Sequence, residues 1–149
     1  MMREMRDTVQ AEVTMTFLVS QDLSFRIPVE LSYDSGDPYA VEITFHLPGD
    51  APVSWAFARE LLLDGLSKPT GEGDVRIAPA SPEGLSDVFI RLQVGCERAL
   101  FRAGAAPLVA FLDRTDRVVP FGQEPAACDP VGDLDAELHR ILAEDRYAG

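Results

Sequence analysis

The sequence predicts an α+β protein in which antiparallel sheets pack against helices. Two observations support this fold class. Apolar residues recur at every second position in three successive runs near the N-terminus, which is the pattern of half-buried antiparallel strands. Further along the chain, apolar residues recur at helical spacing in segments bounded by capping residues, proline and glycine.

The first three strands are expected within residues 13–19, 25–33 and 39–47, where apolar and polar side chains alternate. Residues 34–38 contain aspartate, glycine and proline and therefore suit a hairpin connection between the second and third strands. Pro28 lies inside the second strand and has no N–H to donate. We therefore expect this strand to lie at a sheet edge or to be bulged at Pro28.

A helix is predicted between Asp50 and Gly65. Asp50 can cap it, Pro52 fits its first turn, and Gly65 suits its C-terminal end. Apolar residues recur at helical spacing between these limits: Trp55, Ala58, Leu61 and Leu62.

The second half of the chain repeats this type of pattern. Short strands are predicted at 75–77, 88–94 and 96–102, and a helix is predicted after residue 104. A third helix is expected over 131–145, where apolar residues form one stripe. Three strands followed by a helix thus occur twice, which indicates a possible β-β-β-α duplication. Both helices are preceded by similar sequences, Gly49-Asp50-Ala51-Pro52 and Gly104-Ala105-Ala106-Pro107.

The length of 149 residues predicts one domain. Residues 1–10 have mixed charge and no periodicity, so we expect a flexible tail there and a single domain over 11–149. No apolar run approaches the roughly 18–20 residues that span a bilayer, and the N-terminus lacks the apolar region of a signal peptide. These features predict a cytoplasmic protein without membrane insertion.

The formal net charge of −12 disfavours general binding to nucleic acids, because their phosphates repel an acidic surface. Arg91, Arg98 and Arg102 lie close together on two predicted strands. They are either solvated or ion-paired charges on a strand face, which is the favoured interpretation, or a local basic patch.

The sequence contains no pattern typical of a catalytic or metal site. It has 2 histidines and 2 cysteines, and their spacing does not fit a zinc site. Cys96 and Cys128 are expected to be free thiols. Gly71-Glu72-Gly73 precedes a strand, so a tight turn is favoured over a phosphate-binding loop. We therefore expect neither catalysis, nor a cofactor, nor a metal.

Four residues remain as candidates for contact with a partner protein: Trp55, Arg59, Lys68 and Asp74. Trp55 is either a core anchor or an interface residue, since aromatic residues are enriched in interfaces. Glu60 and Asp64 lie one helical turn apart and could form an acid pair. The neighbouring Arg59 favours a solvated helix face instead.

The residues between Asp37 and Ile77 resemble the SsgA-like proteins of sporulating actinobacteria, and the resemblance extends from about Ala11 to Asp145. The matching residues are Asp37-Pro38-Tyr39-Ala40-Val41, Phe45, Trp55, Phe57-Ala58-Arg59, Leu62, Gly65 and Gly71-Glu72-Gly73-Asp74-Val75. Their order and spacing are specific only when taken together.

The resemblance implies a non-enzymatic regulator of sporulation-specific cell division, with an SsgB-type role as the first expectation. Such a protein is expected to position the FtsZ ring at the septum, together with SsgA-type division proteins. The family also implies a homo-oligomer, most simply a trimer, with a Whirly-like fold. The alternative is a single-stranded nucleic-acid-binding module on that fold, although the net charge opposes it.

Overall fold

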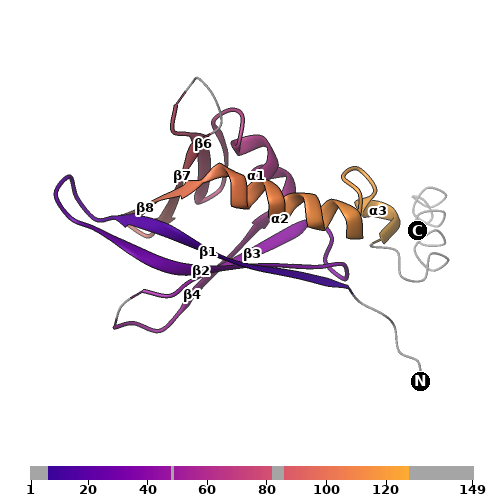
Figure 1. The fold of residues 1–149 in the computed structure, drawn as a ribbon, viewed down its shortest axis with the longest axis horizontal. Coiled ribbons are helices and arrows are strands. Elements are labelled where there is room, and N and C mark those ends of the chain that lie inside the picture. The colour runs from indigo at the N-terminus through magenta and orange to yellow at the C-terminus, as the bar shows by residue number, and fades with distance from the viewer. Residues whose placement is uncertain (1–6, 48, 82–85, 128–149) are drawn as a thin grey trace, which may run out of the picture.

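The structure is a computed structural model that describes residues 7–47, 49–81 and 86–127. Within these residues, strands and helices confirm the predicted α+β class (Figure 1). The elements are β1 (Thr8–Leu18), β2 (Ser24–Asp34), β3 (Ala40–Phe45), β4 (Val53–Ala58), α1 (Arg59–Gly65), β5 (Thr70–Glu72), β6 (Val75–Pro79), β7 (Asp87–Val94), β8 (Glu97–Gly104), α2 (Ala105–Val118) and α3 (Glu124–Ala127).

The strands form one 8-stranded antiparallel sheet with the order β4-β3-β2-β1-β8-β7-β6-β5. The first and last of these described strands, β1 and β8, are therefore neighbours at the centre of the sheet. Their pairing is short, because only Thr16, Phe17 and Leu18 of β1 face β8. Aromatic rings reinforce this junction: Phe101 stacks on Phe17 with centroids 5.0 Å apart and on Phe45 with centroids 4.2 Å apart.

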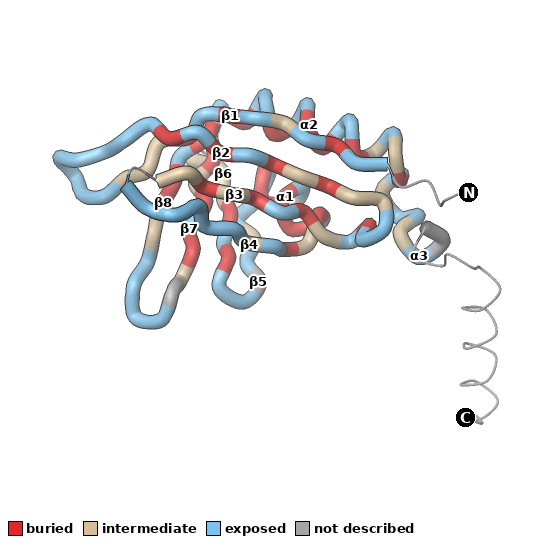
Figure 2. The backbone as a smooth tube through the Cα atoms, turned by 90° about the horizontal axis from the view of Figure 1, so that it is seen from below, coloured by how far each residue is buried: buried red, intermediate tan, exposed pale blue. Residues whose placement is uncertain are grey.

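Buried and exposed residues alternate along the strands (Figure 2). The buried positions lie on one face of the sheet, and α1 and α2 pack against this face. Helix α2 contributes Leu108, Phe111 and Leu112 to the core. It also covers the part of β1 that β8 does not reach, where Arg114 donates a hydrogen bond to the Gln10 carbonyl (2.9 Å).

The predicted helix between Asp50 and Gly65 is wrong in its first half. Val53 to Ala58 form β4, and the helix begins only at Arg59. Val53, Trp55 and Phe57 alternate along β4 and pair with core residues of β3. Consequently four strands precede a helix in each half of the chain, where the sequence predicted three. The duplication and the likeness to Whirly-type proteins stay predictions.

Pro28 lies in an interior strand, which corrects the expectation of an edge or a bulge. Its pairing with Thr14 of β1 is in unbroken register. The Pro28 carbonyl accepts a hydrogen bond from the His46 amide (3.1 Å). The Pro28 nitrogen also points toward β3. It lies just beyond the last paired residues of β2 and β3, which are Val29 and Phe45. The missing donor therefore weakens only the end of this ladder.

Two expectations concern the ends of the chain. Strand β1 begins at Thr8, so residues 8–10 belong to the sheet and not to the expected tail. The helix expected over 131–145, together with Cys128, lies outside the described residues.

Candidate protein-binding edge

Strand β4 is an edge strand whose outer backbone groups are free. Among the described strands, it pairs with β3 alone. The Arg59 amide donates to the Tyr39 carbonyl (2.6 Å), which fixes the alternation of hydrogen bonds along the pair. The N–H and C=O groups of Ser54 and Ala56 therefore point away from β3. Within the described ranges, no hydrogen bond reaches these backbone groups.

The free edge of β4 carries no device that would block the addition of another strand. Natural edge strands are commonly protected by lysine, proline or a bulge. The sequence of β4 has none of these, since it reads Val-Ser-Trp-Ala-Phe-Ala. Ser54 and Ala56 are small and exposed, and Val53 is 40% exposed. An extended chain could approach this backbone closely.

The curl of the sheet places the β5–β6 turn opposite the edge of β4. A hollow of about 350 Å³ is lined by four consecutive residues of β4, by the last residue of the β5–β6 turn and by the first residue of β6: Trp55, Ala56, Phe57, Ala58, Asp74 and Val75. An adjoining hollow of about 340 Å³ is bounded by Ala58 and α1 on one side and by Thr70 and Gly71 of β5 on the other. The two outer strands of the sheet therefore face a shared open space.

The structure brings together two of the four sequence-predicted contact residues. Trp55 and Asp74 line the same hollow beside β4. Trp55 lies opposite Ile43, and its partly buried side chain packs against the core, so it joins the core to the edge. Lys68 is exposed between α1 and β5 and lines neither hollow.

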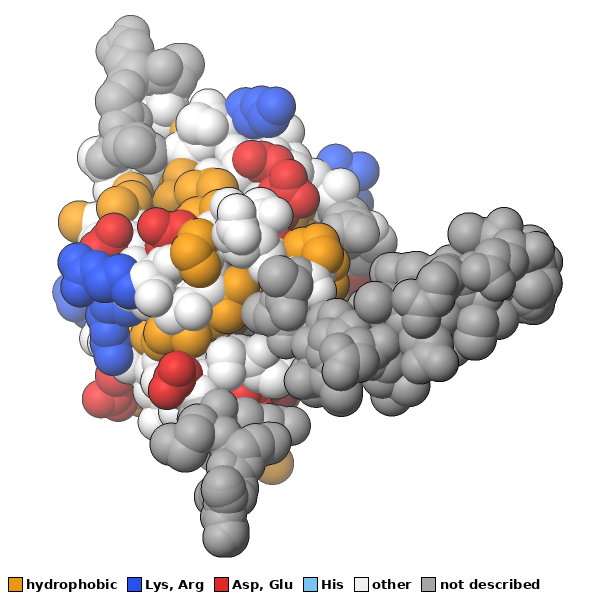
Figure 3. All heavy atoms as spheres, turned by 90° about the vertical axis from the view of Figure 1, so that its right-hand side faces the viewer, with side chains coloured by type: hydrophobic (Ala, Val, Ile, Leu, Met, Phe, Trp, Pro, Cys, Tyr) orange, Lys and Arg blue, Asp and Glu red, His pale blue; other side chains and the backbone are white. Residues whose placement is uncertain are grey.

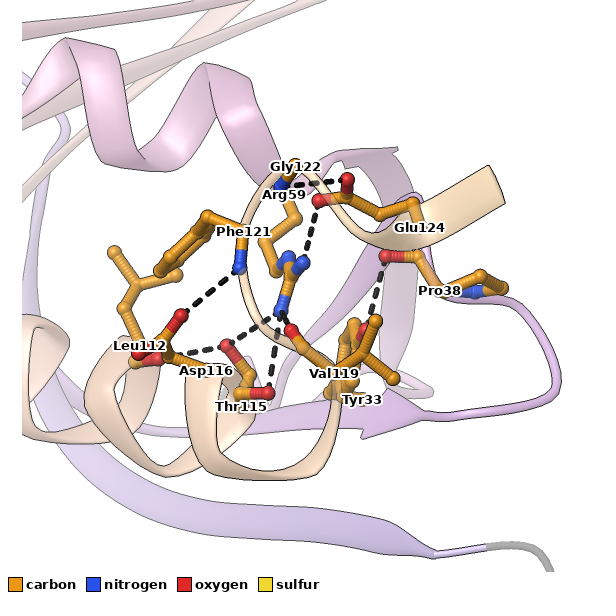
Figure 4. Close-up of polar contacts among 10 residues, drawn as sticks. All are labelled: Tyr33, Pro38, Arg59, Leu112, Thr115, Asp116, Val119, Phe121, Gly122 and Glu124. Carbon is orange, nitrogen blue, oxygen red and sulfur yellow. Dashed lines mark hydrogen bonds and ion pairs between the residues drawn. The ribbon is translucent and has the colours of Figure 1, made fainter. Parts of the chain in front are cut away.

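Arg59 is buried, which corrects the expectation of a solvated arginine or a direct surface contact. Its exposed fraction is 0%. Nη1 donates to the Val119 carbonyl (2.7 Å) and to the carbonyl and hydroxyl oxygens of Thr115 (3.2 and 3.3 Å). Nη2 forms an ion pair with Glu124 at 2.5 Å (Figure 4). The guanidinium carbon also lies 4.1 Å from the centroid of the Phe121 ring.

These contacts make Arg59 the link between three helices. Arg59 follows β4 directly and begins α1, whereas Thr115 and Val119 mark the end of α2 and Glu124 begins α3. A buried guanidinium requires such partners because an unpaired charge in the core is strongly destabilising. Arg59 therefore fixes the C-terminal end of β4 from inside the protein.

Two titratable groups around Arg59 are shifted. Burial raises the pKa of Tyr33 to about 12, although the positive charge of Arg59 opposes this shift. The neutral Tyr33 hydroxyl donates to the Pro38 carbonyl (3.0 Å). Burial would also raise the pKa of Glu124, but hydrogen bonds and the charge of Arg59 outweigh it and lower this pKa. Glu124 is therefore held in its charged form.

The chemistry that this region offers is main-chain pairing and apolar contact. The described residues contain no group of three or more histidine, cysteine or acidic side chains placed to hold a metal ion. Over the same residues, no helix has the length and hydropathy that a membrane span requires. Ser54 and Ala56 were not among the contact residues predicted from the sequence. The alternation of Val53, Trp55 and Phe57 could have revealed their strand, but helical spacing from Trp55 to Leu62 obscured it.

The described residues form a small α+β protein with one curled antiparallel sheet and two longer helices, α1 and α2. Residues 27–124 match the family model described as Streptomyces sporulation and cell division protein, SsgA. The chain belongs to this SsgA-like family.

Curated relatives extend the match to nearly the whole chain. The sporulation-specific cell division protein SsgB of Streptomyces coelicolor is 45% identical over 94% of this chain and 99% of its own length. The protein of the same name from Thermobifida fusca is 40% identical over 91% of this chain and 96% of its own length. These relatives are named for cell division, which gives no support to the nucleic-acid-binding alternative.

Solved structures agree with this family. An SsgA-like sporulation-specific cell division protein from Thermobifida fusca superposes with a TM-score of 0.78 at 39% identity, covering 93% of this chain and 98% of that chain. A second structure comes from work titled "Mutations in SsgB correlate to longitudinal cell division during sporulation of Streptomyces coelicolor". It superposes with a TM-score of 0.77 at 43% identity and covers 84% of this chain and 98% of that chain. The chain thus has a role in sporulation-specific cell division.

Proposed function

We propose that the chain is a non-enzymatic adaptor that recruits or positions FtsZ at sporulation septa, acting in the cytoplasm through protein–protein contacts with FtsZ or SsgA-type division proteins. The identity to SsgB relatives supports the division role. The free β4 edge is the observation that carries the adaptor function, because an unpaired strand can bind an extended segment of another protein by main-chain hydrogen bonds.

In this proposal the partner segment adds as a strand beside β4. Ser54 and Ala56 supply the backbone donors and acceptors. Trp55 and Asp74 line the hollow that receives alternate side chains of the segment. Arg59 does not touch the partner and instead holds the end of β4 in place. Lys68 makes no contact with the segment in this proposal and only adds a positive charge to the surface near the β4 edge.

We also propose that the protein self-associates, with the trimer that the family resemblance implies. The hairpin between β1 and β2 projects from the body of the molecule, at the left of Figure 1. Three apolar side chains near its tip are exposed: Val19 (46%), Leu23 (47%) and Phe25 (41%). Such exposure at a projecting tip is expected of an interface.

The opposite end of the molecule offers a second apolar surface. A hollow of about 210 Å³ there is lined in part by Tyr39, Leu63 and Phe121. Figure 3 faces this end and shows apolar side chains gathered near its centre, with acidic side chains around them. Apolar surfaces at two opposite ends favour head-to-tail contacts, which close into a ring when the rotation between copies allows it.

The division role can be tested by complementation in Streptomyces coelicolor. The chain would replace the SsgB relative, and fluorescent FtsZ would report ring formation in sporulating hyphae. We expect regular FtsZ rings and sporulation septa to return. Hyphae that accumulate the folded chain without forming septa would contradict the proposal.

A further inference from the structure

Arginine side chains gather on the solvent face of the sheet, opposite the face that carries the core. Arg76 of β6 lies directly across from Arg91 of β7. Arg102 of β8 faces Thr16, which in turn faces Arg26 of β2. We call these side chains, with their neighbour on β8, the arginine face: Arg26, Arg76, Arg91, Arg98 and Arg102.

Among the residues that the structure describes, most of the charge on the arginine face has no ion-pair partner. All of its members are exposed. Within the described part of the chain, only Arg102 has a carboxylate partner, Asp87 at 2.9 Å. Like charges directly opposite each other in a sheet are destabilising, and Arg76 and Arg91 form such a pair. This concentration of positive charge occurs in a chain with a net charge of −12.

Two members of the arginine face, Arg76 and Arg91, border a hollow whose other lining residues are mostly apolar. The hollow has a volume of about 420 Å³ and is the largest of the hollows described above. Arg76 and Arg91 line it together with apolar residues of three strands and the segment before β5, among them Pro69, Phe89 and Leu100. A cationic rim around an apolar lining suits a ligand that carries both carboxylates and an apolar side chain.

Gly71 determines where the Arg76 side chain can lie. A Cβ atom at Gly71 would approach Arg76 Cγ to 2.8 Å and Nη1 to 3.0 Å. The arginine side chain therefore rests on the bare backbone of β5. Phe89, which also lines the hollow, has the guanidinium carbon of Arg102 5.7 Å from its ring centroid. Packing thus restrains the charged groups near the hollow before a ligand arrives.

We propose that the arginine face binds an acidic segment of a partner protein, with one apolar side chain of the segment in the hollow. The proposal rests on the adaptor function and assigns a second contact surface to it, separate from the β4 edge. A long nucleic acid fits less well, because Glu12, Glu30 and Glu42 lie on the same face of the sheet over β1 to β3. A phosphate backbone that continued across the sheet would meet these acids.

The test uses a fluorescein-labelled peptide of alternating Glu and Asp residues around one central Phe, with fluorescence anisotropy as the readout. We expect Arg91→Ala to weaken binding by about tenfold, the scale of a lost hydrogen bond between charged groups. Arg117→Ala removes the same charge from the exposed surface of α2 and is expected to leave binding within about twofold. Gly71→Ala retains every charge but displaces Arg76, so it too should weaken binding.

A version of the peptide with Ser in place of Phe should bind more weakly, because it leaves the hollow unfilled. Equal loss of affinity in Arg91→Ala and Arg117→Ala would overturn the proposal. Tighter, arginine-dependent binding of single-stranded oligo-dT would overturn it in favour of nucleic acid. If Arg91→Ala abolishes self-association, the arginine face binds a second copy of this chain, and the proposal is overturned. If FtsZ or an SsgA-type protein binds while the peptide does not, this inference fails alone. If the peptide binds while neither FtsZ nor an SsgA-type protein does, the adaptor function fails alone.

Discussion

Arg59 and Glu124 lie 65 positions apart in the sequence and form a largely buried ion pair. This ion pair ties the end of β4 to the start of α3. The Arg59 side chain is 1% exposed and that of Glu124 is 14% exposed. The same guanidinium binds the carbonyls that end α2. The edge strand proposed to bind partners is therefore held by contacts made on the other side of the core.

Loss of the Arg59 guanidinium should destabilise the whole domain. We expect Arg59→Met to lower the free energy of unfolding by about 3–5 kcal/mol, because Glu124 and the end of α2 lose a buried charged partner. Chemical denaturation monitored by Trp55 fluorescence measures this change. Arg117→Ala breaks an exposed ion pair with Asp113 and should cost no more than about 1 kcal/mol. Equal effects of the two substitutions would contradict the assigned role of Arg59.

The charged form of Glu124 should make stability depend on pH in the acid range. Burial opposes this form, but Arg59 outweighs burial and lowers the pKa below the ordinary value of 4.5. The resulting stabilisation is present above pH 4.5 and is lost as the pH falls through the lowered folded-state pKa. Glu124→Gln should be less stable at neutral pH and should lose less stability on acidification. An unchanged acid slope in urea titrations would refute this account.

Tyr33 should make stability depend on pH in the alkaline range. Its pKa is raised from 10.0 to about 12, so the fold favours the neutral phenol. The contribution is complete below pH 10.0 and is lost as the pH rises to about 12. Tyr33→Phe should flatten this alkaline loss of stability. It should also cost about 1 kcal/mol at neutral pH, because the hydrogen bond to Pro38 disappears.

Gly65 permits close contact between α1 and β6. A Cβ atom at this position would lie 2.5 Å from the Cβ atom of Ile77, which is fully buried. Gly65→Ala should therefore lower the melting temperature, at a cost of about 1–3 kcal/mol from overpacking. Gly104→Ala is the matched control, since its nearest neighbour would be Pro107 Cδ at an ordinary 3.6 Å. The hypothesis fails if both variants melt at the wild-type temperature.

The projecting hairpin should carry part of the self-association. Leu23→Ser replaces an exposed apolar side chain near the tip, where no core contact is lost. We expect sedimentation velocity to show a shift toward smaller species, while circular dichroism reports an unchanged fold. Ser24→Ala, at the adjacent exposed position, should sediment like the wild type. Unchanged sedimentation of the Leu23→Ser protein would show that the hairpin is not part of the interface.

The free N–H of Ala56 allows a specific test of strand addition. Ala56→Pro removes this outward-facing donor and leaves the hydrogen bonds to β3 in place, because those involve the flanking residues. It should reduce partner binding by about tenfold or more. Ala56→Thr retains the N–H and favours strand geometry, so it should bind like the wild type. The binding assay would compare both proteins after equal melting temperatures have been established.

Much of the sheet could be predicted because its strands bury one face only. The resulting alternation is visible in the sequence for β1, β2, β3 and β7. Strand β4 was mistaken for helix because Trp55, Ala58 and Leu62 lie at helical spacing across the boundary between a strand and a helix. Local periodicity cannot locate such a boundary, since the pairing with β3 that creates it is a tertiary contact.

The candidate site was predictable in part. An exposed or half-exposed tryptophan and an acidic turn residue are recognisable as possible contacts, and the structure places Trp55 and Asp74 beside one hollow. The burial of Arg59 was not predictable, because its partners come from residues 33 and 115–124 and none is near in sequence. The free backbone of Ser54 and Ala56 depends on which strands pair, and side-chain identity does not reveal it.

Direct binding between the purified chain and FtsZ of the same organism tests the adaptor function most directly. Biolayer interferometry with immobilised FtsZ should give saturable binding that Ala56→Pro weakens and Ala56→Thr retains. A folded chain that sediments as a strict monomer and binds neither FtsZ nor an SsgA-type protein would contradict the account.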